Sequence, residues 1–130
     1  MLANLHIRDY VIVDELNLSF DKGFIGLTGE TGAGKSILID ALSLSLGARS
    51  ESGLIRKGCE KAEIITEFNI KNNQAVIQWL KDNDLYDDEF LLLRRTIFAD
   101  GRSKAYINSI PSPISKLKDV SELLIDIYSQ

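Results

Sequence analysis

The sequence has few of the features that mark secreted or membrane proteins. Its 130 residues contain a single cysteine, Cys59, so no disulfide can form within the chain, and a reducing cytoplasm is the expected compartment. No apolar run approaches the roughly 20 residues that cross a bilayer. His6, Arg8 and Asp9 interrupt the N-terminal segment, which argues against a signal peptide. We therefore predict a soluble cytoplasmic protein with no membrane partner, in which Cys59 is an unreactive thiol.

Positive charge is also scarce. Lys and Arg number 15 against 19 Asp and Glu, which gives a formal net charge of −4 and a pI near 5.0. Domains that bind nucleic acid are usually basic, so a DNA contact has to come from a local patch or from other parts of the protein. Hydrophobic residues make up 45% of the chain. This share is typical of a folded core, and the length fits one domain or part of one.

Alternation of apolar and polar residues predicts β-strands in both halves of the chain. The expected strands cover residues 5–8, 15–20, 63–70, 90–98 and 104–108. Asp100-Gly101 is a strong hairpin signal between the last two. A turn at residues 21–23 leads into a short apolar run at 24–28, which is typical of a buried strand. Residues 124–128 are expected to form one more strand, after a break at Pro111 and Pro113.

Three segments read as helices. Residues 36–46 are apolar except for a narrow stripe of Asp40 and Ser43, so we expect other elements to cover most sides of this helix. Gly47 is the expected C-terminal stop. Residues 73–83 form a modest amphipathic pattern in which Trp79 is read as a core anchor. The third predicted helix spans residues 114–123.

One motif carries chemistry. Eight consecutive residues fit the phosphate-binding pattern G-x-x-x-x-G-K-[ST]; they are Gly29, Glu30, Thr31, Gly32, Ala33, Gly34, Lys35 and Ser36. Glycines let the backbone curl with its N–H groups pointing inward, and with the positive end of the next helix these amides form a nest for anions. The ammonium of Lys35 would reach the β- and γ-phosphates of ATP, and the Ser36 hydroxyl would coordinate Mg²⁺. The alternative is a glycine-rich turn with an incidental lysine, and the predicted strand before and helix after the motif argue against it.

Hydrolysis of ATP requires further groups. A carboxylate must hold the metal, and another group must position the attacking water. No apolar run ending in Asp-Glu occurs here, and Ile125-Asp126 is too short a signal. We therefore expect this chain to bind ATP and to hydrolyse it poorly alone. Because the chain stops at Gln130 without a turn or polar tail, we interpret it as a fragment of a longer protein.

The residues around the motif resemble the N-terminal segment of proteins of the RecN family. These proteins are bacterial DNA repair ATPases of the SMC-like ABC class. The resemblance covers nearly the whole chain. It is carried by Leu5-His6-Ile7-Arg8-Asp9-Tyr10, Leu27-Thr28 and the motif, Ile39-Asp40-Ala41-Leu42, Asp100-Gly101-Arg102-Ser103 and Tyr106-Ile107-Asn108. The combination of the motif with the Asp-Gly-Arg-Ser hairpin is more specific than the motif alone.

This resemblance implies an α/β fold of the P-loop NTPase class. Residues 1–130 would form the N-terminal lobe of an ABC-type ATPase head, with an antiparallel β subdomain and a mixed sheet around the P-loop helix. A coiled coil and a C-terminal lobe with the signature and acidic motifs would follow. Two heads would self-associate across ATP, and their closure would be coupled to holding DNA in double-strand break repair and recombination, at the nucleoid.

The resemblance also implies residue roles. Gln130 matches by position the Q-loop glutamine, which contacts Mg²⁺ and the attacking water. Lys35 and Gln130 are then the catalytic candidates, and Ser36 and Gln130 are the candidate metal ligands. The family usually has His-Gly before this glutamine, where this sequence has Tyr128-Ser129.

Several arginines are also candidates. Arg56 lies where SMC-type heads place an arginine near nucleotide and DNA, and a solvated loop arginine is an equal alternative. With Arg49 and Lys57 it could form a small basic patch. Arg94 and Arg95 lie within one predicted strand, so we expect at least one of them to face solvent or to be paired.

Other functions share the same motif. The nucleotide-binding subunit of an ABC transporter usually carries an N-terminal aromatic residue that stacks on adenine, whereas Tyr10 here is expected to pack. Another SMC-like ATPase is a closer alternative. A small-molecule kinase is disfavoured by the β-rich stretches on both sides of the motif. A fourth alternative is that this chain alone acts as a non-catalytic binding module.

Overall fold

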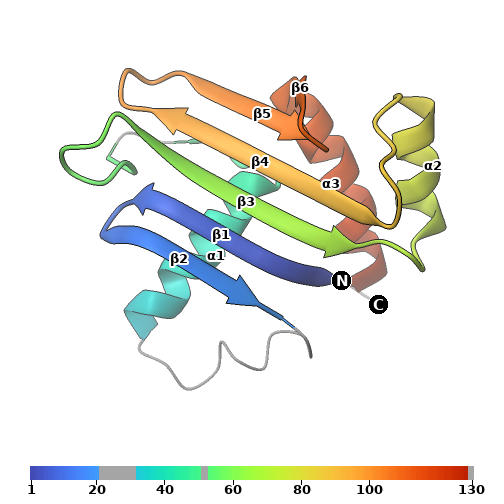
Figure 1. Ribbon diagram of the computed structural model, residues 1–130, viewed down its shortest axis with the longest axis horizontal. Helices are drawn as coiled ribbons and strands as arrows, with labels where there is room; N and C mark the ends of the chain where they lie inside the picture. Colours follow the sequence, from blue (N-terminus) through green and yellow to red (C-terminus); the bar gives the residue numbers. More distant parts are fainter. Residues whose placement is uncertain (21–31, 51–52, 129–130) are drawn as a thin grey trace.

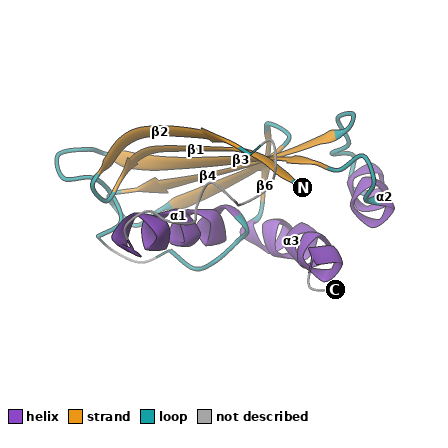
Figure 2. Ribbon diagram, turned by 90° about the horizontal axis from the view of Figure 1, so that it is seen from below, coloured by secondary structure: helices purple, strands orange, loops and turns teal. Residues whose placement is uncertain are grey.

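In the described part of the chain, six strands form one sheet, and the helices lie on one face of it or at its end (Figures 1 and 2). The computed structural model describes residues 1–20, 32–50 and 53–128, with the backbone alone for 32–35 and 125–128. The elements in chain order are β1 (Leu2–Tyr10), β2 (Val13–Ser19), α1 (Gly32–Ser45), β3 (Lys61–Asn69), α2 (Gln74–Asp82), β4 (Phe90–Phe98), β5 (Ser103–Ile107), β6 (Ile110–Ser112) and α3 (Ile114–Tyr128). The strand order is β2-β1-β3-β4-β5-β6 (Figure 1). Figure 2 shows α1 and α3 on the same side of this sheet.

The period-two pattern sets which side chains face the helices. On the central strand β3, Ile64 and Phe68 are buried on the helix side, whereas Glu63 and Glu67 lie on the other face. Its neighbours β1 and β4 both pair with it in antiparallel register. The predicted strands at residues 5–8, 15–20, 63–70, 90–98 and 104–108 are thereby confirmed.

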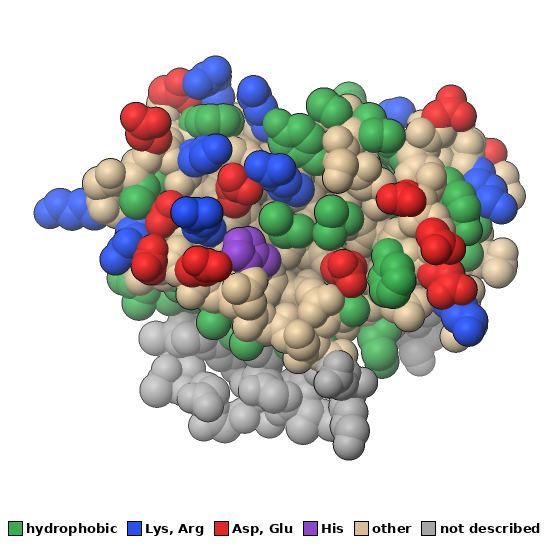
Figure 3. Space-filling view, in the orientation of Figure 1, with side chains coloured by type: hydrophobic (Ala, Val, Ile, Leu, Met, Phe, Trp, Pro, Cys, Tyr) green, Lys and Arg blue, Asp and Glu red, His purple; other side chains and the backbone are tan. Residues whose placement is uncertain are grey.

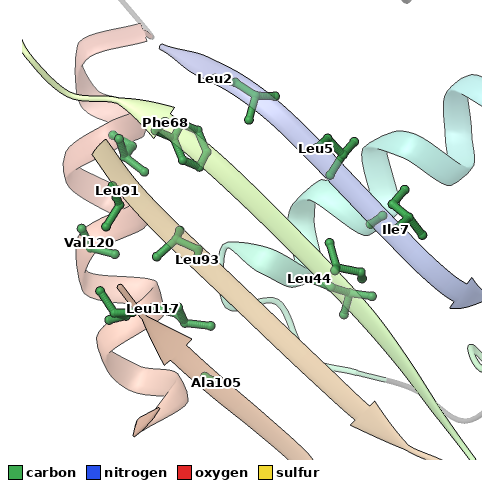
Figure 4. Close-up of a cluster of buried hydrophobic side chains, with 14 of the residues drawn as sticks. Leu2, Leu5, Ile7, Leu44, Phe68, Leu91, Leu93, Ala105, Leu117 and Val120 are labelled. Atoms are coloured by element: carbon green, nitrogen blue, oxygen red, sulfur yellow. The ribbon is translucent and has the colours of Figure 1, made fainter. Parts of the chain in front are cut away.

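The core fills the space between the sheet and the two helices. Leu44 of α1 and Leu117 of α3 belong to the same buried cluster as Leu5 and Ile7 of β1 and Leu93 of β4 (Figure 4). The cluster also includes the buried face of α2, which begins where the side chain of its N-cap residue, Asn73, accepts a hydrogen bond from the Val76 backbone at 3.0 Å. Trp79 is half-buried against this cluster, which confirms its reading as a packing residue.

Charges are mixed on the face of the sheet away from the helices. Figure 3 shows Lys and Arg side chains interspersed with Asp and Glu over this face. Arg94 of β4 pairs with Glu63 of β3 at 3.0 Å, and its guanidinium lies over the ring of Tyr106 at 5.1 Å. Lys61 also approaches Glu63, at 3.6 Å. Glu63 thus pairs with two of the cations on this face.

Two expectations for the last third of the chain are wrong. The first is the break expected at Pro111 and Pro113, which is wrong at Pro111. Instead, Asn108 and Ser109 take positive φ angles of 49° and 69°, and the chain turns back into β6, which contains Pro111. Proline lacks a backbone donor, and it is tolerated here because β6 is the edge of the described sheet.

The second wrong expectation is a strand at residues 124–128. These residues continue α3 without interruption. Leu117, Val120 and Leu124 are buried at spacings of three and four, so one apolar helix face runs on past the predicted end at residue 123.

The expected turn at 21–23 and strand at 24–28 lie outside the described residues. All pairings between the described strands are antiparallel. The antiparallel subdomain is thus observed, and the mixed sheet around the P-loop helix stays a prediction.

Asp100 organises the hairpin between β4 and β5. Its carboxylate accepts hydrogen bonds from the backbone N–H of Arg102 at 3.0 Å and from the Arg102 side chain at 2.8 Å, and Gly101 takes a φ of 96°. The hydrogen bond from the Arg102 backbone is the largest cause that lowers the pKa of Asp100 below its usual 3.8. The hairpin predicted from Asp100-Gly101 is confirmed.

We predict a small pH-dependent contribution of Asp100 to stability. A carboxyl with a lowered pKa in the folded state stabilises the protein above its unfolded-state pKa, and this contribution is lost as the pH falls through the folded-state value. Asp100→Asn should therefore lower the urea midpoint at pH 7, and the difference from wild type should shrink below about pH 4. If the urea midpoints of wild type and Asp100→Asn differ by the same amount at pH 7 and below about pH 4, the Asp100 carboxylate is not the source of this stability.

Candidate nucleotide site at the start of α1

The phosphate-binding motif coincides with the beginning of α1. The helix starts at Gly32, four residues before the expected start at 36, so Gly32, Ala33, Gly34 and Lys35 make up its first turn. The first four N–H groups of an α-helix have no partner within the helix. In this chain those four groups belong to the motif.

This arrangement fits an anion in two respects. Unpaired N–H groups and the helix dipole give the N-terminus a partial positive charge, and glycine or alanine lets a ligand approach the backbone closely. Ser36 follows one turn into the helix, and its side chain is exposed. Gly29, Glu30, Thr31 and Gln130 lie outside the described residues, so their roles stay predictions.

The far end of α1 is closed by a tight turn. Gly47 takes a φ of 101°, and its N–H donates to the carbonyl of Leu44 at 3.1 Å. The next N–H, of Ala48, donates to the carbonyl of Ser43 at 3.1 Å. This pair of bonds is the Schellman arrangement that ends helices at glycine. The predicted stop at Gly47 is confirmed.

Arg95 reaches this same end of α1 from β4. It is 1% exposed, and its Nη1 donates to the carbonyls of Leu44 at 2.9 Å and Ala48 at 2.8 Å. Its Nε donates to the Ser103 hydroxyl at 2.6 Å. Burial lowers the pKa of the Arg95 guanidinium. Arg94, on the opposite face of the strand, carries the ion pair with Glu63.

Arg94 confirms the expectation that at least one of these two arginines would face solvent or be paired. The sequence prediction did not identify Arg95 as the buried one. The sequence did contain a pattern that indicates burial of Arg95, because residues 91, 93, 95 and 97 share one strand face. Leu91, Leu93 and Ile97 on that face are buried. An arginine in the same series has to be buried as well, and buried cations need hydrogen-bond acceptors.

The other candidate residues are less organised. Arg56 pairs with Asp14 at 3.3 Å, and its backbone N–H donates to the Asp9 carbonyl at 2.9 Å. The pKa of the nearby Cys59 thiol is raised by burial and then by the charge of Asp9, which is the direction of an unreactive thiol. At the β4–β5 hairpin, Arg102 pairs with Asp100. Arg56 and Arg102 are thus each paired with a nearby carboxylate.

No helix in the described part of the chain is both long and apolar enough to span a bilayer.

Within the described residues, the six-stranded antiparallel sheet and the motif-bearing helix have the fold of solved SMC ATPase heads. The backbone superposes on an SMC ATPase structure from work on ATP-driven dimerization and DNA-stimulated activation, with a TM-score of 0.75 and 24% identity over 95% of this chain and 79% of that chain. The sequence matches the family model of the AAA domain over residues 4–126. The chain therefore belongs to the AAA domain family.

Among proteins of that kind, the sequence is similar to RecN. It is 48% identical over 130 residues to the DNA repair protein RecN of Vibrio cholerae serotype O1, and 44% identical over 133 residues to the DNA repair protein RecN of Haemophilus influenzae. Each match covers all of this chain and 24% of the relative. The resemblance expected from the motifs is confirmed, and the chain spans about a quarter of the length of these relatives. This similarity favours the SMC-like hypothesis over an ABC transporter subunit.

Proposed function

We propose that this chain binds Mg²⁺-ATP as the N-terminal lobe of a RecN-like ATPase head acting in DNA double-strand break repair and recombination. The observation that carries the proposal is the start of α1 at Gly32, which assigns the free N–H groups of the helix to the residues of the phosphate-binding motif. The similarity to RecN proteins over the whole chain supplies the biological setting.

Each motif residue has a distinct task in this proposal. The backbone of residues 29–34 would surround the phosphates, and the ammonium of Lys35 would balance the charge on the β- and γ-phosphates. The exposed Ser36 hydroxyl offers a ligand for Mg²⁺. When bound, Mg²⁺ draws charge from the phosphate oxygens, which makes the γ-phosphate easier to transfer. Gln130 is proposed as a second metal ligand that also orients the attacking water.

The exposed apolar side of α1 suits contact with another part of the full-length protein. Ala41 and Leu44 are buried against the sheet, yet Ile39 is 48% exposed and Leu38 and Leu42 are only half-buried. A helix that is apolar on all sides is normally covered on all sides. We propose that the protein's own C-terminal lobe covers this face, since the curated relatives continue far beyond the matched segment.

The complete protein would act as a pair of heads. Self-association across ATP brings the signature motif of one head to the P-loop of the other, and DNA is held by the full-length protein. The mixed charge on the visible face of this lobe favours DNA contacts elsewhere in the assembly (Figure 3). This setting places the protein in the cytoplasm, at the nucleoid.

We predict that binding of ATP to this protein depends on Mg²⁺. In isothermal titration, ATP and ADP with Mg²⁺ should bind, AMP should not, and chelation of the metal by EDTA should weaken ATP binding, because the site recognises β- and γ-phosphates together with their metal. The 130-residue chain should release little phosphate, since its sequence has no acidic motif. Equal affinity for AMP and ATP would rule out the proposed site, and steady turnover would rule out the need for the second lobe.

A further inference from the structure

Buried polar side chains gather at the C-terminal end of α1. Ser45, Thr66, Arg95 and Ser121 are each less than 5% exposed, and they come from α1, β3, β4 and α3. The Thr66 hydroxyl bonds to that of Ser45 at 3.2 Å, and the Ser121 hydroxyl donates to the Leu46 carbonyl at 2.8 Å. The end of the helix opposite the phosphate-binding motif is therefore held by polar contacts within an otherwise apolar core.

Arg95 makes the most directional of these contacts. Its three hydrogen bonds connect the C-terminal end of α1 to the sheet. Nη1 donates to the carbonyls of Leu44 and Ala48, and Nε donates to the Ser103 hydroxyl on β5. A guanidinium is planar, so bonds from two of its nitrogens fix direction as well as distance. The Leu44 carbonyl is in the last turn of α1 and Ala48 follows the helix, so both acceptors lie at the negative end of the helix dipole, where a cation is favoured.

Stability alone is a poor explanation for this residue. Burial of a charge costs free energy even where hydrogen bonds compensate, and apolar side chains of similar volume often replace buried charges without loss. Among the described residues, the acceptors around Arg95 are neutral oxygens. The neighbours on the same strand face, Leu91, Leu93 and Ile97, are aliphatic, so an aliphatic side chain would match their apolar character.

A helix transmits the position of one end to the other. α1 has 14 residues, which corresponds to about 21 Å at about 1.5 Å per residue. If its C-terminal end shifts along the axis, the residues at its start shift with it. Resting on the ATP-binding function proposed above, we propose that Arg95 is a positioning residue that sets the depth at which Gly32–Ser45 presents its first turn to the nucleotide phosphates.

The test compares variants of the full-length protein. Arg95→Met keeps the side-chain volume and removes the donors, and Arg95→Lys restores a cation within reach of the same carbonyls. Leu93→Ala, two residues along the same buried strand face, is the control for lost packing. Circular dichroism fixes a temperature at which every variant is folded, and Mg²⁺-ATP affinity is measured there by titration with a fluorescent ATP analogue.

We expect Arg95→Met to weaken nucleotide binding by about tenfold or more, which is the range of supporting contacts around a bound ion. Arg95→Lys should recover part of this loss, and Leu93→Ala should bind like wild type despite its lower unfolding temperature. The proposal is overturned if Arg95→Met binds within about twofold of wild type. It is also overturned if affinity falls in Leu93→Ala and Arg95→Met in proportion to their stability. Absence of Mg²⁺-ATP binding in wild type would instead refute the proposed function.

Discussion

Lys35→Ala is expected to weaken Mg²⁺-ATP binding by about 10- to 100-fold, because a hydrogen bond to a charged group contributes about 1.5–3 kcal/mol. The lysine follows directly on the three small residues that open α1. Backbone N–H groups at this end offer partial charges, whereas the ammonium supplies a full one. Its loss should therefore reduce affinity for ATP and ADP, and affect AMP little. Isothermal titration with each nucleotide measures the difference.

Two controls separate this loss from unfolding. Alanine has a higher helix propensity than lysine, so the substitution should not destabilise α1. Lys71→Ala removes an exposed lysine from the loop after β3 and leaves the motif intact. If Lys35→Ala and Lys71→Ala bind ATP equally well, the phosphate-binding role of the motif is wrong, and the ATPase hypothesis loses its main support.

The period-two strands could be predicted because burial on one face of a sheet enforces alternation. The sequence predicts β4 with the bounds it has, although Leu91, Leu92 and Leu93 are consecutive apolar residues and do not alternate with polar ones. The start of α1 is harder to predict. Glycine disfavours helix interiors, so the sequence favours a start after Gly34. In the first turn this penalty matters less, because the N–H groups there have no helical partner in any case.

Other features could not be predicted because tertiary contacts decide them. β6 contains Pro111 and forms because an edge strand needs few donors. The role of Arg95 depends on carbonyls nearly fifty residues away in the chain, at Leu44 and Ala48. The chemistry of the candidate site could be predicted from local sequence alone, because the motif is contiguous. What holds that site in place depends on contacts distant in sequence.

Each end of α1 thus depends on particular residues. At the C-terminal end, the structure requires glycine at position 47. An L-residue there would adopt φ near 101°, and its Cβ would lie 2.7 Å from Cγ and 3.0 Å from the backbone N of Lys118 on α3. Left-handed backbone costs an L-residue about 1–2 kcal/mol. Overpacking costs about 1–3 kcal/mol. The backbone nitrogen cannot move without shifting α3 as a whole.

Gly47→Ala is accordingly expected to lower the free energy of unfolding by about 2–5 kcal/mol, the sum of these two costs. Gly101→Ala is the matched control, because Gly101 has a φ of 96° and a Cβ added there would meet nothing within 4 Å. Both substitutions restrict the unfolded chain by the same amount, so this effect cancels between them. Urea denaturation of the two variants then isolates the clash with α3, expected at about 1–3 kcal/mol. Equal losses in both would mean that α3 gives way at Lys118, and that the close contact between the two helices does not fix the end of α1.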